Sequence, residues 1–297
     1  MPGHSYNLIR RCRDCADGRE FTYNGKTYSL GEDFSASGSN SQCVDISSES
    51  ARALTYAITE AYAEYFRDYG CKKINIGADE VKVDDSAWRG YALINGGSTQ
   101  FDAFIIYINS LCRILKDKGY TVRAFNDYLF SAESNVKLDP ELEICWWNGS
   151  SASFPKNRVL YNCIQNNCYY VLRKTSNGVD ARDKGCTHWD FNHSNARRIY
   201  CGCGKADCSC RGGWNPTRFW KNDFSSPAGG YFLIWGDWAA SDTESNIFYR
   251  TDDYGLVDRM WANITKMIDR DADESMSFGD FQKSVEPYRI FPGGNKD

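Results

Sequence analysis

Two carboxylates stand side by side in the segment INIGADEV, residues 74–81, where an apolar stretch ends at Asp79 and Glu80. Acidic neighbours in a turn are commonly no more than solvated side chains. A pair of carboxyls at the end of a buried strand, however, supplies the groups that general acid–base catalysis requires. The two cases differ in whether other functional side chains lie at the same edge of the fold as the acid pair.

Other strand-like segments also end in polar or aromatic side chains. The pairs that close them are Asn126 and Asp127, Trp146 and Trp147, and Trp235 and Asp237. In parallel α/β folds, the loops at the carboxyl ends of the strands build the functional site. This recurrence favours a site around the acid pair, although each tryptophan could also be ordinary core and Asp127 a plain turn residue.

Apolar stretches alternate with amphipathic helices, which predicts parallel βαβ units and an α/β fold. Strands are predicted at residues 73–78, 121–125, 142–147, 159–163 and 231–235. One helix is marked by the apolar residues from Phe101 to Leu115 and closed by Gly119, and another spans residues 254–269. Periodicity leaves open whether the sheet is doubly wound or closed into a barrel.

A helix over residues 47–69 takes Ser47 or Ser48 as its N-cap and Gly70 as its stop. Its helical spacing predicts one apolar face, made of Leu54, Ile58, Tyr62, Tyr65 and Phe66.

Composition sets the broad class. The chain has 297 residues, 42% hydrophobic and 25% charged, which is typical of a soluble globular protein. The net charge of −4 gives no basic surface for nucleic acid. We find no membrane span and no signal peptide, since MPGHSYNLIR lacks an apolar core. The 15% aromatic content suits sugar stacking but also suits a large core.

The alternating pattern fails over residues 173–230, which predicts a cysteine-rich inserted loop or subdomain before the last strand. The chain holds 13 cysteines in all. The closest group is Cys201, Cys203, Cys208 and Cys210. Disulfides, a structural zinc and free thiols all remain open for this group, although zinc sites usually have a wider spacing within each pair.

The strand end Asn75-Ile-Gly77-Ala-Asp79-Glu80 resembles the His/Asn-x-Gly-x-Asp-Glu signature of glycoside hydrolase family 20, the β-N-acetylhexosaminidases. Other segments resemble that family in the same order along the chain. They are Met1-Pro-Gly-His4, Val44-Asp-Ile-Ser-Ser-Glu-Ser-Ala-Arg52, Phe125-Asn-Asp-Tyr-Leu129 and Trp235-Gly-Asp237. Phe125 departs from the family pattern, which usually has tryptophan there.

The resemblance implies a (β/α)8 TIM barrel that forms a single catalytic domain over residues 1–297, with 173–230 inserted in it. Because the chain starts inside the family's Pro-Gly-His loop, the barrel is expected to be incomplete at its N-terminus, with about six of eight strands. The missing part would carry any signal peptide, so we expect a secreted or cell-surface protein.

The resemblance also implies retaining hydrolysis in which the 2-acetamido oxygen of the substrate attacks the anomeric carbon and forms an oxazolinium. Glu80 would protonate the leaving oxygen and later activate water. Asp79, ionised, would accept from the acetamido N–H. Tyr170, with Tyr169 as a near alternative, would hydrogen-bond the acetamido carbonyl. No metal or other cofactor takes part.

The remaining family positions would bind the substrate. His4 would hydrogen-bond Glu80, and Asp237 would accept from sugar hydroxyls. The residues expected to line the sugar pocket are Phe125, Asn126, Asp127, Trp146 or Trp147, and Trp235. The expected partner is a glycan with a terminal N-acetylhexosamine, and the sequence does not fix the oligomeric state. The alternatives are a lacto-N-biosidase that releases a disaccharide and a non-catalytic sugar-binding remnant.

Overall fold

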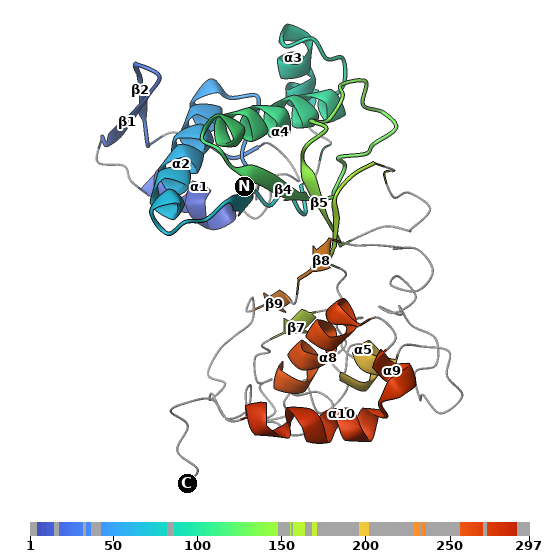
Figure 1. Cartoon of the computed structure of the whole chain (residues 1–297). Coiled ribbons are helices and arrows are strands. Elements are labelled where there is room, and N and C mark those ends of the chain that lie inside the picture. The colour runs from blue at the N-terminus through green and yellow to red at the C-terminus, as the bar shows by residue number, and fades with distance from the viewer. Residues whose placement is uncertain are drawn as a thin grey trace, which may run out of the picture. The chain divides into compact units, whose positions relative to one another are not determined.

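The computed structural model describes residues 5–14, 18–31, 34–36, 43–81, 83, 86–147, 155, 157–163, 168–170, 196–201, 228–231, 233–235, 256–269 and 272–289. The chain divides into two units (Figure 1). The first holds Met1–Cys145 and Pro155–Leu160, and the second holds Trp146–Phe154 and Tyr161–Asp297. A single domain over residues 1–297 stays a prediction.

The first unit begins with α1 (Tyr6–Asp14) and a hairpin of β1 (Glu20–Tyr23) and β2 (Lys26–Ser29). Alternating elements follow: α2 (Glu49–Asp68), β3 (Lys73–Asn75), α3 (Ser86–Ile94), α4 (Gln100–Asp117), β4 (Thr121–Phe125) and β5 (Glu143–Trp146). The second unit contains Trp146 at the end of β5, β6 (Leu160–Asn162) except for Leu160, and these further elements: β7 (Cys168–Tyr170), α5 (Ala196–Cys201), β8 (Gly229–Gly230), β9 (Leu233–Trp235), α8 (Leu256–Ile268), α9 (Ala272–Ser275), α10 (Phe278–Val285) and a 3₁₀ turn (Glu286–Arg289).

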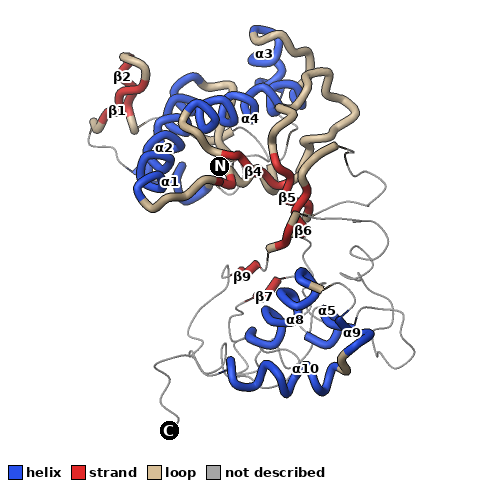
Figure 2. Tube along the Cα trace, in the orientation of Figure 1, coloured by secondary structure: helices blue, strands red, loops and turns tan. Residues whose placement is uncertain are grey.

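The strands are drawn in red in Figure 2, and apart from the β1–β2 hairpin they pair in parallel, as predicted. β4 lies between β3 and β5, with Asn75 opposite Arg123 on one side and Arg123 opposite Glu143 on the other. In the second unit, β6 pairs with β8 and β7 pairs with β9, again in parallel. Parallel neighbours need crossover connections, and α3 and α4 provide the one between β3 and β4.

The helix ends follow the capping signals in the sequence. Ser48, not Ser47, caps α2 by accepting from the backbone N–H of Ala51. Thr99 caps α4 in a reciprocal capping box with Asp102. Gly70 and Gly119 follow the two helices with φ of +71° and +85°, a conformation that glycine adopts without steric cost.

The predicted apolar face of α4 is confirmed. Its six members are all buried: Phe101, Phe104, Ile105, Ile108, Leu111 and Leu115.

The predicted apolar face of α2 is wrong over its second half, because Tyr62 and Tyr65 are 56% and 57% exposed and Phe66 is 36% exposed. The buried residues of α2 are mainly small: Ala51, Ala53, Leu54, Thr55, Thr59 and Ala63. Small side chains let α2 approach α4 (Figure 1), where the hydroxyl of Tyr107 donates to Thr55 Oγ1 over 2.9 Å.

One end of the three-stranded group carries an ionic cluster. Glu143 is 7% exposed and accepts from Lys73 Nζ over 2.9 Å and from Arg123 Nε over 2.7 Å. Burial alone would raise the pKa of Glu143, but the hydrogen bonds from Arg123 and Lys73 outweigh it and lower that pKa. The cluster joins β3, β4 and β5 through one carboxylate.

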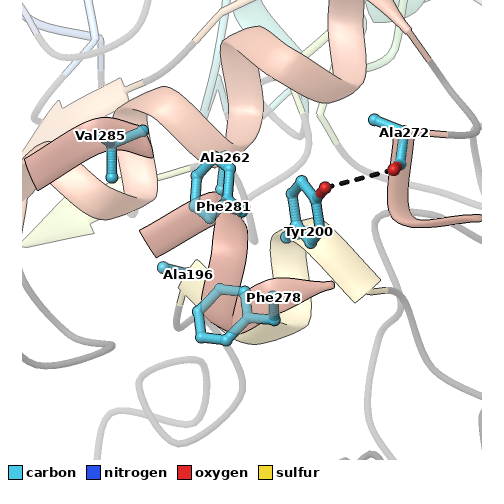
Figure 3. Packing of buried hydrophobic residues seen from close by; sticks show 7 residues of the cluster. All are labelled: Ala196, Tyr200, Ala262, Ala272, Phe278, Phe281 and Val285. Carbon is cyan, nitrogen blue, oxygen red and sulfur yellow. Dashed lines mark hydrogen bonds between the residues drawn. The ribbon is translucent and has the colours of Figure 1, made fainter. Parts of the chain in front are cut away.

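The second unit has its own core, around Tyr200 (Figure 3). The Tyr200 ring stacks on Phe281 with 4.4 Å between centroids, and its hydroxyl donates to the carbonyl oxygens of Ala272 and Met276. The other members are Ala196, Ala262, Phe278 and Val285. This cluster binds α5, α8, α9 and α10 to one another.

Candidate active site

The acid pair lies in a turn with unusual backbone geometry directly after β3. Gly77, Ala78 and Glu80 have φ of +76°, +77° and +53°. The left-handed conformation costs a non-glycine residue about 1 kcal/mol or more, so it persists only where the surroundings impose it. Such strain is concentrated at functional sites, which makes this turn a candidate for one.

The turn is anchored from within by Asn75. Its Oδ1 accepts from the backbone N–H of Gly77 over 2.8 Å, and its Nδ2 lies 3.5 Å from Cys145 Sγ on β5. Ala78 and Val81 are buried, with 0% and 1% of their surface exposed. These apolar residues fix the turn on both sides of the acid pair.

As a result, the two carboxylates have different environments. Asp79 is half-buried, whereas Glu80 is exposed. A half-buried carboxylate is shielded from solvent and can act electrostatically, whereas an exposed one can reach a ligand and exchange protons with water. The geometry therefore allows a division of roles between the two acids.

A short paired segment supports the turn from the N-terminal part of the chain. The backbone N–H of Ala36 donates to the carbonyl of Cys43, and that of Asp45 donates to Phe34, both over 2.9 Å. The buried Cys43 places its thiol 4.0 Å from the carbonyl oxygen of Glu80. Sequence reasoning missed Cys43, because nothing in its local pattern marks a contact 37 residues away.

The end of β4 lies beside this turn. The backbone N–H of Phe125 donates to the carbonyl of Gly77 over 2.8 Å, so the ladder continues past the last residue of β3. Asp79 and Asp127 each follow two residues after this hydrogen bond. Asn126 is 9% exposed and Asp127 is half-buried. The structure thus brings Asp79, Glu80, Asn126 and Asp127 to one edge of the first unit.

The two tryptophans at the end of β5 differ in exposure. Trp146 is 2% exposed, and the alternation of the strand puts it on the same face as Ile144, which is fully buried. Trp147 is half-buried. Of the two, Trp147 is the better candidate for contact with a ligand, and Trp146 has the burial of a core residue.

Two other predicted site residues are register partners. Tyr170 on β7 lies opposite Trp235 on β9, and Tyr169 lies opposite Ile234. Tyr170, and not Tyr169, is therefore the register partner of Trp235. His4 and Asp237 lie outside the described residues, and so do Cys203, Cys208 and Cys210.

Among the residues that the structure describes, no group of three or more His, Cys, Asp or Glu could hold a metal ion. Cys201 lies at the end of α5. The zinc or disulfide at the cysteine group stays a prediction. Within the same residues, no helix is long and apolar enough to cross a membrane.

Sequence reasoning also missed Asp102, whose carboxylate ties the loop after β4 to the start of α4. It accepts from the backbone N–H groups of Ser98, Thr99, Asn135 and Val136 and from the hydroxyls of Ser98 and Ser134, over 2.7–3.1 Å. Burial would raise the pKa of Asp102, but these donors hold it well below its usual range. The pattern Thr99-x-x-Asp102 signals the capping box but not the tertiary contacts.

Comparison with known proteins places the fold. No family model matches the sequence. A GH20 catalytic module of the pneumococcal exo-β-D-N-acetylglucosaminidase StrH matches with a TM-score of 0.53 and 15% identity, over 90% of this chain and 80% of that chain. Dispersin B matches with a TM-score of 0.54 and 16% identity, over 90% of this chain and 70% of its own.

The β-N-acetylhexosaminidase from Bacteroides fragilis matches with a TM-score of 0.52 and 16% identity. That match covers 100% of this chain but only 55% of the Bacteroides chain. At such identities the likeness concerns the fold. The chain therefore has the fold of these glycoside hydrolase family 20 structures, an α/β fold of the (β/α)8-barrel type.

Proposed function

We propose that this chain is a glycoside hydrolase that removes terminal β-linked N-acetylhexosamine from glycans with the help of the substrate's own acetamido group. The observation that carries the proposal is the strained turn of Gly77 to Glu80, which presents two adjacent carboxylates of unequal exposure at the edge where β3 and β4 end. The fold shared with the StrH catalytic module supports it.

Glu80 is the proton donor in this proposal. Its exposed carboxyl can reach the glycosidic oxygen of a bound glycan, donate a proton as the bond breaks, and then deprotonate the incoming water. Both steps need the side chain to exchange its proton with solvent or substrate, which an exposed position allows.

Asp79 acts by charge. Ionised and half-buried, it accepts the acetamido N–H, which directs the acetamido oxygen toward the anomeric carbon, and it stabilises the positive charge of the oxazolinium. The substrate thus supplies the nucleophile, which is why two carboxyls can stand next to each other in sequence. Enzymes that place a protein nucleophile opposite the acid need their two carboxyls farther apart.

The other predicted residues keep in this proposal the roles that the resemblance implies for them. Tyr170 hydrogen-bonds the acetamido carbonyl, Trp235 and Trp147 stack on the sugar, and Asp127 and Asp237 accept from its hydroxyls. His4 hydrogen-bonds Glu80. The chemistry needs no cofactor, and a secreted or cell-surface protein would meet its glycans outside the cell.

A non-catalytic sugar-binding protein is the second candidate. Backbone strain occurs at ligand-binding sites as well as at catalytic sites, so the left-handed Ala78 and Glu80 agree with both candidates, and the rates of the Glu80 and Asp79 variants decide between them. A lacto-N-biosidase would use the same acid pair and would differ in the depth of the pocket.

Substitution of the two acids tests the proposal, because they should fail in different ways. Glu80→Gln keeps the shape but cannot transfer a proton, so it should slow a disaccharide far more than an aryl glycoside with a good leaving group. Asp79→Asn should slow both substrates by similar factors, of order 10²–10³. Glu20→Gln, at an exposed acid on β1, is the control and should change neither rate. Equal losses in both site variants, or none, would contradict the proposal.

A further inference from the structure

An exposed aromatic ring directly follows Asp127 at the edge where the acid pair lies. Tyr128 is 46% exposed and has a φ of +52°. It is thus a bulky residue in the left-handed region, where bulky residues are rare, and it shares this backbone conformation with Ala78 and Glu80 in the loop after β3. The strain indicates that the position of Tyr128 is imposed by its surroundings.

The surroundings of Tyr128 are well defined. Its ring packs against Phe101 at the start of α4, with 5.8 Å between centroids and 44° between planes. Phe101 itself is 8% exposed, so one side of the tyrosine rests on the core. The backbone carbonyl of Tyr128 accepts from the N–H of Ser131 over 3.2 Å.

The same loop is held farther along by Asp102, through Ser134, Asn135 and Val136. Thr99 Oγ1 adds a hydrogen bond to the carbonyl of Glu133. With both ends of residues 126–136 fixed to β4 and α4, little conformational entropy is lost when a ligand covers the ring.

Position and chemistry together suggest what this ring binds. Asp127, its neighbour, follows the Phe125–Gly77 hydrogen bond by two residues, as Asp79 does. The ring of a tyrosine offers a flat apolar face, which complements the C–H face of a pyranose.

We propose that Tyr128 is the platform on which the sugar next to the cleaved N-acetylhexosamine stacks. This inference rests on the proposed function and deepens it, because it makes the chain selective for glycans that continue with a second sugar ring. Asp102 is then a positioning residue that acts through the loop, without touching the substrate.

The test compares substrates with and without a second ring. We choose Tyr128→Asn, because asparagine tolerates the left-handed conformation, together with Tyr128→Phe. Tyr62→Ala is the matched control, since Tyr62 is 56% exposed and also stacks on a phenylalanine, Phe66, with 5.9 Å between centroids. The substrates are N,N′-diacetylchitobiose and N-acetyl-β-glucosaminyl fluoride, whose leaving group has no ring.

Tyr128→Asn should lower kcat/KM for the disaccharide by about three- to tenfold, the usual worth of one aromatic contact. It should leave the fluoride rate unchanged, and Tyr128→Phe and Tyr62→Ala should keep both rates. Equal effects of Tyr128→Asn on the two substrates, or no effect on the disaccharide, would overturn the inference.

Failure of the proposed function can be told apart from failure of this inference. If the native chain cleaves neither substrate, the proposed hydrolase function is refuted. The role of Tyr128 is then tested by measuring sugar-binding affinities. In a calorimetric titration, the native chain should bind N,N′-diacetylchitobiose more tightly than N-acetylglucosamine, and Tyr128→Asn should remove that difference. Equal affinity of the native chain for the two sugars would refute a role for Tyr128 in binding a second ring.

Discussion

The backbone N–H of Phe125 donates to the carbonyl oxygen of Gly77 over 2.8 Å, and this hydrogen bond joins the two strand-end loops of the candidate site. The acid pair begins two residues after Gly77, and Asp127 stands two residues after Phe125. The chain leaves strand geometry at Gly77, so the carboxylates are placed by a turn whose shape the neighbouring residues impose. Substitution of the residues that hold this turn and its neighbouring loop therefore tests each contact separately.

Asn75 should be important for the acid pair without touching a substrate. Asn75→Ala removes the acceptor for the Gly77 N–H and should lower kcat by about tenfold through misplacement of Glu80. Asn75→Asp keeps an oxygen at the same place and should retain most of the rate. Steady-state kinetics of the two variants check this. Full activity of the alanine variant would show that the turn holds its shape without Asn75.

Asp102 should stabilise the first unit in a pH-dependent way. Asp102→Asn presents an amide to six N–H and O–H donors and should cost about 2–3 kcal/mol of unfolding free energy at pH 7. Because the pKa of Asp102 is depressed in the folded state, its stabilisation is complete above the unfolded pKa of about 4. It is lost as the pH falls from there toward the folded-state pKa.

Urea unfolding of the native chain and the Asp102→Asn variant at pH 7 and near pH 3 measures this effect. The difference between the two proteins should shrink at the lower pH. Asp68→Asn, at an exposed position at the end of α2, is the control and should behave like the native chain. A difference that does not depend on pH would contradict the role of the ionised carboxylate.

Glu143 should matter far more than the neighbouring acid Glu141. Glu143→Ala leaves Lys73 and Arg123 without their shared buried carboxylate and should destabilise the fold by about 2–3 kcal/mol. The carboxylate of Glu141 is 71% exposed, so Glu141→Ala should cost less than about 1 kcal/mol despite its contact with Lys116. Thermal unfolding compares the two, and similar losses would refute the importance of burial at Glu143.

The sequence alone was sufficient to predict the helices and strands that follow from short-range patterns. Period and capping predicted α4 and its buried face from Phe101 to Leu115, and the helix at 254–269 is found as α8. The parallel strands and their polar ends followed from short apolar stretches between helices. These features depend on residues a few positions apart, which a sequence shows directly.

Features that depend on tertiary contacts could not be predicted in this way. Tyr62, Tyr65 and Phe66 have helical spacing typical of a buried face, but α2 packs through its alanines and threonines, which approach α4 more closely. The left-handed turn at Ala78 and Glu80 and the thiol of Cys43 beside it arise from long-range packing. Asp102 was not singled out by its local sequence, because its carboxylate also accepts from residues more than 30 positions away.

The most direct test of the central claim is the dependence of hydrolysis on the acetamido group of the substrate. We compare the rates at which the chain releases 4-methylumbelliferone from its N-acetyl-β-glucosaminide and from its β-glucoside, with a reaction that contains no protein as the blank. If the acetamido oxygen is the nucleophile, the first substrate should react faster by a factor of order 10³ or more, because the glucoside lacks the internal nucleophile. Equal rates on the two substrates would contradict substrate-assisted catalysis by Asp79 and Glu80.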